Sequence, residues 1–201
     1  MNPFAQQKAL VAGHSYVPLT DRAVLCLRGT DRISWLDSLT SQHVLPGVST
    51  QTLILVPHGH IEYDLHVVDS ADTTWLIVLA DSAEALQKYL DGMRFLMDVH
   101  VERAEEQVFW VPRREVVADH PTWLIPAEFA GLGSTESGTD RGGSAAKYVP
   151  QRPGTFVGAE VIGWHPDEAP ASQWAYDALR IAAGVPQVGV DTDSKTLPHE
   201  M

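Results

Sequence analysis

The stretch TLILVPHGHIEYDLHVVD, residues 52–69, has the pattern of two β-strands joined by a turn. Residues 52–56 are mostly apolar and predict a buried strand, whereas residues 60–69 alternate between polar and apolar side chains. Gly59 supplies the conformational freedom that a tight turn between the two strands needs. We therefore expect an antiparallel hairpin with one face packed on a core.

The alternation sorts the second strand into two faces. The apolar face carries Ile61, Tyr63, Leu65 and Val67, and the polar face carries His60, Glu62, Asp64 and His66. The spacing favours exposure of the polar face to water, and leaves open that Asp64 lines a cavity as a hydrogen-bond acceptor or general base. We expect no metal site on the histidines of this hairpin, because zinc ligands follow tighter, repeated spacings.

The rest of the chain continues this mixture of strands and helices. Further strands are expected at residues 23–29, 73–81, 98–104, 107–112 and 154–164, and helices after residue 30, from Asp81 with Glu84 in a capping box, and from Ser172 to Ala183. Residues 131–154 are rich in Gly, Ser and Thr and predict a loop. Because pairs of strands alternate with single helices, the pattern favours an α+β fold over a parallel α/β sheet.

The expected last helix raises the question of what Arg180 does. Trp174, Ala178 and Ala182 recur at four-residue spacing and predict its packed stripe, which leaves Arg180 roughly opposite. The simplest interpretation of Arg180 is exposure to solvent. The alternative is that its guanidinium receives a ligand carboxylate in bidentate fashion.

Bulk composition excludes several classes of protein. The chain has 201 residues, with 14 basic and 26 acidic side chains and a formal net charge of −12. This negative charge disfavours direct binding to the phosphate backbone of a nucleic acid. No apolar run is long enough to span a bilayer, and the first residues lack the pattern of a signal peptide. Cys26 is the sole cysteine, so an internal disulfide is excluded. We expect a soluble, cytoplasmic protein.

Four stretches, in order, resemble the folate-binding YgfZ family, which is related to the glycine-cleavage aminomethyltransferase, or T-protein. They are LRGTDRISWLDSLTSQHV, VPHGHIEYDLHVVD, WLIVLADSAEALQKYLDGMRFLMDVHVE and ALRIAAGVPQVGVDTDSKTLPHE. The resemblance implies a ring of three domains, of which this chain holds two α+β lobes and lacks the C-terminal β-barrel. It implies a discontinuous first domain, residues 1–45 and 113–201, around an inserted ferredoxin-like α+β domain, residues 46–112.

The resemblance further implies a channel that binds tetrahydrofolate or a derivative. Carried over by position, the folate-binding candidates are Asp64, Tyr63, Arg94, Arg180 and Glu200. The T-protein hairpin has paired acids before its leucine, of which Asp64 keeps the second position and Tyr63 replaces the first. Ala182 stands where the family has a glutamate. No catalytic residue is assigned, because these departures separate the chain from the T-protein pattern.

Three functions follow as alternatives. The first is a folate-binding YgfZ-like protein that supports iron–sulfur enzymes, their assembly or repair, and tRNA modification, with iron–sulfur proteins as partners. The second is a folate-dependent aminomethyltransferase or demethylase, and the third is a scaffold for a protein partner that binds no folate. The family continues past the PxE position of Glu200 with a Lys-Gly-Cys signature and the barrel. We therefore expect this chain to be a piece of a longer protein.

Overall fold

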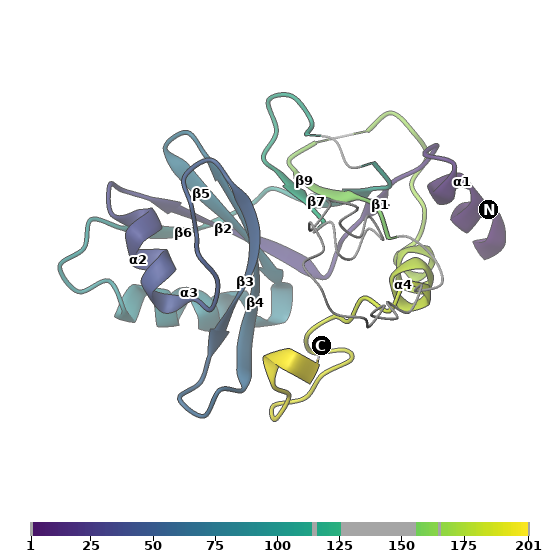
Figure 1. Cartoon of the computed structure of the whole chain (residues 1–201). Helices are drawn as coiled ribbons and strands as arrows, with labels where there is room; N and C mark the ends of the chain where they lie inside the picture. Colours follow the sequence, from purple (N-terminus) through teal and green to yellow (C-terminus); the bar gives the residue numbers. More distant parts are fainter. Residues whose placement is uncertain (1, 114–115, 126–155, 165, 201) are drawn as a thin grey trace, which may run out of the picture.

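A computed structural model describes residues 2–113, 116–125, 156–164 and 166–200 of the chain. Over these residues the fold is α+β, with two antiparallel sheets and four α-helices (Figure 1). The fold class predicted from the sequence is confirmed, and neither sheet closes into a barrel in the described part of the chain. The glycine-rich loop expected at 131–154 lies outside the described residues.

The larger sheet is built around the hairpin that the sequence predicts. Its five strands are ordered β3-β4-β5-β2-β6, with bounds β2 (Arg22–Arg28), β3 (Ser49–Leu55), β4 (Ile61–Ser70), β5 (Thr73–Leu79) and β6 (His100–Ala104). β3 and β4 pair antiparallel, and the register shifts between Ile54 and Leu55 near the turn. Alternation holds along β4, since Leu65 and Val67 pack in the core on one face while Asp64 and His66 lie on the other.

Two helices cover the first of these faces, as Figure 1 shows. They are α2 (Arg32–Leu39) and α3 (Ala83–Gly92), which follows a 3-10 turn, η1 (Ala80–Ser82). Trp35, Leu36, Leu86 and Leu90 pack from the helices onto the sheet. The capping box expected at Asp81 and Glu84 is wrong, because Ser82 precedes α3 and no side chain caps its first turn.

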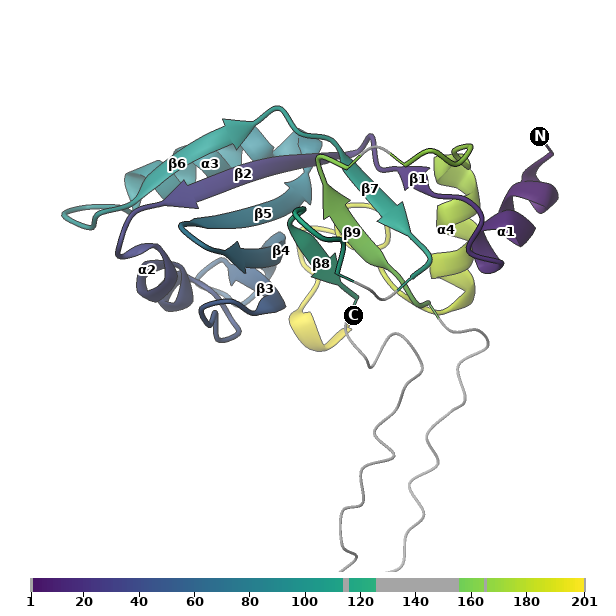
Figure 2. The ribbon, with the colours of Figure 1, turned by 90° about the horizontal axis from the view of Figure 1, so that it is seen from above.

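The smaller sheet has the order β1-β7-β9-β8 and lies beside the larger one (Figure 2). Its strands are β1 (Val17–Pro18), β7 (Val108–Val111), β8 (Thr122–Leu124) and β9 (Ala159–Ile162), and it is accompanied by α1 (Pro3–Val11), α4 (Gln173–Ala182) and a final 3-10 turn, η2 (Pro198–Glu200). One apolar core joins the two sheets, since Val24, Val68 and Ile77 of the larger sheet pack in the same cluster as Trp110 and Trp123.

The packed stripe of α4 differs from the prediction. The buried side chains are Ala175, Tyr176 and Arg180, whereas Trp174 is 58% exposed. The residues expected to pack, at four-residue spacing from Trp174, therefore lie on the side of the helix away from the core. Tyr176 provides the large apolar surface that α4 buries, and it packs edge-on against Trp110.

The two sheets divide the chain at places other than the expected domain boundaries. β2 lies in the range expected for the first domain, yet it pairs with β5 and β6 of the larger sheet. Without β3, the order β4-β5-β2-β6 with helices after β2 and β5 is a ferredoxin-like βαββαβ arrangement. This arrangement takes in residues 22–45, which the expected range 46–112 leaves out. Independent folding of either part stays a prediction.

Candidate functional site

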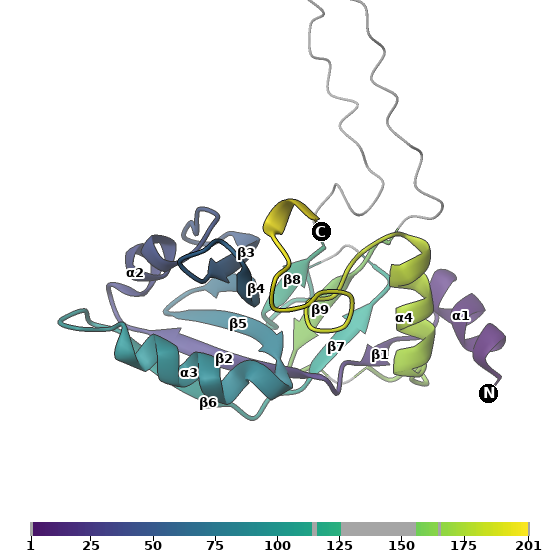
Figure 3. The ribbon, with the colours of Figure 1, turned by 90° about the horizontal axis from the view of Figure 1, so that it is seen from below.

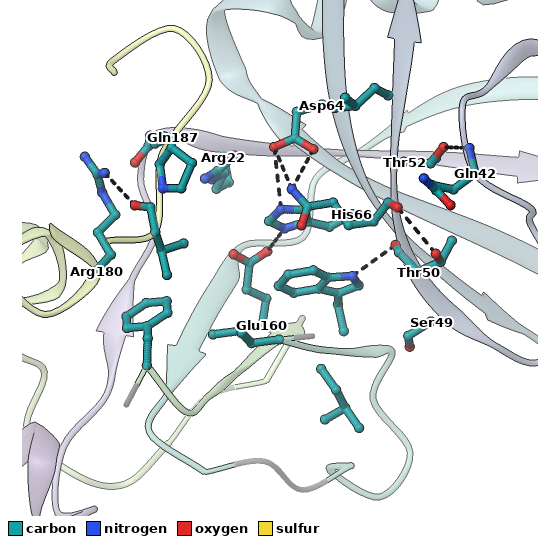
Figure 4. A pocket seen from close by; sticks show the side chains of 18 of the residues that line it. Arg22, Gln42, Ser49, Thr50, Thr52, Asp64, His66, Glu160, Arg180 and Gln187 are labelled. Carbon is teal, nitrogen blue, oxygen red and sulfur yellow. Dashed lines mark hydrogen bonds and ion pairs between the residues drawn. The ribbon is translucent and has the colours of Figure 1, made fainter. Parts of the chain in front are cut away.

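A cleft of about 920 Å³ lies between the two sheets (Figure 4). β3 and β4 line one side of it, and residues of β8, β9 and α4 line the other. The segment after α4 completes the lining with Pro186, Gln187 and Pro198. Figure 3 shows this segment running from α4 across the smaller sheet to the C-terminus near β8. Ligand sites in proteins are concave and combine apolar walls with a few converging polar groups.

The polar face of β4 lines this cleft. The side chains of Asp64 and His66 are 9% and 8% exposed. The expectation of solvent exposure is therefore wrong for these two residues, which face the smaller sheet, whereas Glu62 on the same strand is exposed as expected. The side-chain amide of Gln51 donates to both carboxylate oxygens of Asp64, at 3.0 and 3.2 Å. This contact fixes the direction of the Asp64 carboxylate at the edge of the cleft.

His66 links the two sheets through two contacts. Its Nδ1 lies 2.8 Å from the Glu160 Oε2 of β9, and its ring stacks on Trp123 of β8 with ring centroids 3.7 Å apart and planes 4° from parallel. Its Nε2 lies 3.9 Å from Asp64 Oδ2, which is beyond hydrogen-bond distance. One imidazole is thus held on its face by an indole and at one nitrogen by a carboxylate.

Glu160 is an acid at the centre of an apolar sheet. It is 1% exposed and lies in register with Trp110 on one neighbouring strand and Trp123 on the other. Burial by itself raises the pKa of Glu160, but the charge and hydrogen bond of His66 and the charge of Arg22 outweigh it and leave the pKa below its ordinary value. Glu160 is therefore an ionised carboxylate paired with His66.

Arg22 brings a positive charge to the same face of the larger sheet. Its Nε is buried and, within the described part of the chain, donates to no acceptor. Burial by itself lowers the pKa of Arg22, but the negative charges of Glu160, Asp21 and Asp64 outweigh it and leave the pKa above its ordinary value, so the guanidinium stays charged. Native structures rarely leave a buried donor unpaired, so this Nε requires an explanation.

Arg180 also lines the cleft, but its hydrogen bonds are made within the protein. Its Nε donates to Asp177 at 3.0 Å, and its Nη1 donates to Asp191 at 2.5 Å and to the carbonyl of Val185 at 3.2 Å. It is 3% exposed, so the expectation of a solvent-facing arginine is wrong. Arg180 ties the segment 185–191 to α4, and this segment carries Pro186 and Gln187 into the cleft wall.

The remaining three predicted site residues lie elsewhere. Tyr63 packs beside the core under α2 and α3, with its ring 6.2 Å from that of Tyr89. Arg94 follows α3, where it pairs with Asp91 and donates to the carbonyl of Val99. Glu200 is in η2, where it accepts from the backbone N–H of Leu197. The structure therefore brings together Asp64 and Arg180, and adds Arg22, His66 and Glu160, which the sequence did not single out as site residues.

The described residues give no support for a metal site, a membrane-spanning helix or a reactive thiol. Among them, no group of three or more histidine, cysteine, aspartate or glutamate side chains is arranged to hold a metal ion. No helix in the same residues combines the length and apolar character needed to cross a membrane. Cys26 is buried in β2, and burial raises the pKa of its thiol, so it is not poised as a nucleophile.

Comparison with known proteins supports the fold of this chain but not a function. No family model and no curated protein sequence matches the chain. Among solved structures, the fold is similar to that of the glycine cleavage system aminomethyltransferase T from Bartonella henselae, with a TM-score of 0.55 and 13% sequence identity. The match covers 90% of this chain and 48% of that chain, so the present chain spans about half the length of the protein it resembles. The two proteins share an aminomethyltransferase-like α+β fold.

Proposed function

We propose that this chain binds tetrahydrofolate or a derivative in the cleft between the two sheets. The observation that carries the proposal is the combination of groups in one cavity: the carboxylate of Asp64, the guanidinium of Arg22 with its unpartnered Nε, and three aromatic rings, those of Trp123, Phe156 and Tyr176. The folate itself is suggested by the resemblance in sequence, and the aminomethyltransferase-like fold supports it.

The residues present fit the chemistry of a folate. A pterin is flat and carries several N–H donors, which suit aromatic walls and the Asp64 carboxylate held by Gln51. The glutamate tail is anionic and suits a charged guanidinium. Arg22 is the better candidate for such a contact than Arg180, because the Nε and Nη1 of Arg180 are already bonded to Asp177, Asp191 and Val185. Tyr63, Arg94 and Glu200 take no part in this version of the site.

We also propose a biological role for the folate-binding protein. We favour a YgfZ-like role in the cytoplasm, in support of iron–sulfur enzymes, their assembly or repair, and tRNA modification. Aminomethyl transfer or demethylation is the second candidate, and it is favoured by Asp64, which stands at the second acidic position of the T-protein hairpin and faces the cleft. Tyr63 weighs against transfer, because it replaces the first acid and packs on the opposite face of β4.

Titration calorimetry with tetrahydrofolate and 5-formyltetrahydrofolate tests folate binding. Asp64→Asn keeps the shape of the side chain and removes its charge, so it should weaken binding by about 1–3 kcal/mol through the loss of charged hydrogen bonds. Glu62→Gln is the matched control, because Glu62 is an exposed acid two residues away on the same strand and outside the cleft lining. Its affinity should equal that of the unchanged protein.

The outcomes separate the three candidate functions. Saturable binding that weakens in Asp64→Asn but not in Glu62→Gln supports folate binding in the cleft. Turnover of a methylated amine or an aminomethyl-lipoyl protein in the presence of tetrahydrofolate would favour the transferase. If neither folate binds, the proposal of a folate protein fails and the third candidate, a scaffold without folate, takes its place.

A further inference from the structure

The two ring nitrogens of His66 have different surroundings. Nδ1 is 2.8 Å from the ionised Glu160, so it carries a proton that is donated to that carboxylate. Nε2 belongs to a residue that lines the cleft, and its nearest carboxylate oxygen, on Asp64, is 3.9 Å away. Because that distance is too long for a hydrogen bond, Nε2 remains available to a group bound in the cleft.

We propose that ligand binding in the cleft is coupled to protonation of His66, which donates from Nε2 to an acceptor atom of the ligand while Glu160 holds the ring from Nδ1. This inference rests on the proposed folate site and adds a residue and a proton to it. The acceptor is a carbonyl oxygen, a carboxylate oxygen or an unprotonated ring nitrogen. Since Nδ1 already carries a proton, donation from Nε2 requires the imidazolium form. Glu160 acts through His66 and is a positioning residue.

Charged groups on three strands surround this imidazole. Asp64 lies two residues along β4, Glu160 faces it from β9, and Arg22 reaches the same region from β2, with Tyr176 of α4 close to both Arg22 and Glu160. The two carboxylates attract a proton on His66, and Arg22 opposes it. The stack on Trp123 fixes the plane of the ring, so Nε2 keeps its direction when the ring gains or loses that proton.

The direction of the pH dependence follows from this arrangement. If the complex needs imidazolium, the ligand binds the protonated form better, and affinity rises as the pH falls. Once the pH is above the range in which the free His66 titrates, affinity should drop about tenfold for each further pH unit, the value expected for one proton. Where the free protein has already lost that proton, binding should take up close to one proton per ligand.

The test is titration calorimetry of the whole chain with 5-formyltetrahydrofolate between about pH 6 and pH 9, the range around the ordinary titration of histidine. Each pH is measured in two buffers of different ionisation enthalpy, which gives the number of protons taken up.

His66→Gln keeps an N–H donor but cannot titrate, so its affinity should be independent of pH and its proton uptake should vanish. Glu160→Gln keeps an acceptor without the charge, and its proton uptake should move to lower pH. His58→Gln, in the exposed β3–β4 turn, is the control and should behave as the unchanged protein.

The measurement on the unchanged protein decides the matter even if a variant fails to fold. Affinity and proton uptake that do not change with pH would overturn the inference, and so would equal proton uptake in His66→Gln and the unchanged protein. In both cases folate binding itself would stand. Absence of folate binding at every pH would overturn the proposed function, and this inference with it.

Discussion

At the scale of single residues, Arg180 is a side chain whose direction was predicted but whose burial was not, and its role in ligand binding stays a prediction. Placement on the side of α4 opposite Trp174 and Ala178 is correct, but that side is the buried one. Its partners, Asp177 and Asp191, are separated from it by three and eleven residues, and only the second contact depends on the fold of the segment after α4. A sequence pattern gives the direction of a side chain, and the burial of that direction depends on distant residues.

Arg180→Ala should lower the free energy of unfolding by about 1–3 kcal/mol, because it removes charged hydrogen bonds and leaves the Val185 carbonyl without this donor. Urea unfolding followed by circular dichroism measures the change. Arg28→Ala is the control, because the pair of Arg28 with Glu102 is half-exposed and should contribute about 0–1 kcal/mol. Equal losses in the two variants would contradict the structural role of Arg180.

Glu160 and His66 differ in how much of their pairing the sequence indicates. Glu160 is an isolated acid inside the apolar run FVGAEVIGW, residues 156–164, and a charge in such a run is expected to be paired. The partner could not be identified from the pattern, because His66 is 94 residues away and on another sheet. Arg22 gave no signal, since an arginine at the start of a strand is most often solvated.

At the scale of elements, local signals predicted what the structure shows wherever an element is long and periodic. β2, β3, β4, β5 and the helices α2, α3 and α4 lie where the pattern placed them. The short strands β1 and β8 were missed, because two or three residues carry no period and their pairing comes from β7 and β9. α1 was also missed, although Pro3 at its first position and Asn2, which caps Ala5, are typical of a helix start.

The connection from β2 to α2 provides a test at this scale. Gly29 has a φ of +115°, and a Cβ at this position would collide with the backbone carbonyl of Asp98. The same connection is tied to that segment by Thr30, which donates to the Asp98 carboxylate, and by Asp31, which accepts from the Asp98 N–H. Gly29→Ala should therefore cost about 1–3 kcal/mol of stability through strain and loss of these contacts.

Gly92 provides the matched substitution for this prediction. It ends α3 with open space around its Cα, so Gly92→Ala should be neutral or stabilise by up to about 1 kcal/mol through helix propensity. Thermal unfolding of both variants gives the comparison. If Gly29→Ala is as stable as Gly92→Ala, the close approach of residues 29 and 98 is not a feature of the folded protein.

At the scale of the whole molecule, the cleft is a consequence of how the two sheets meet. One apolar cluster joins them through Val24, Val68 and Trp123, and the polar faces of β3 and β4 beside it are left to line the cavity. No local pattern contains this information, since it depends on pairing between the sheets. The resemblance in sequence predicted the aminomethyltransferase-like fold. The chain passes from one sheet to the other near residues 19–22 and 104–108, and the domain boundaries expected at 45 and 113 stay a prediction.

A crystal structure of this chain grown with 5-formyltetrahydrofolate tests directly whether folate binds in the cleft between the two sheets. Electron density for the pterin is expected in the cleft beside the stacked rings of His66 and Trp123, within hydrogen-bond distance of Asp64 and of His66 Nε2, with an acidic group of the ligand near Arg22. A well-ordered folate bound outside the cleft, or a cleft that stays empty at saturating folate while the protein is otherwise well ordered, would contradict it.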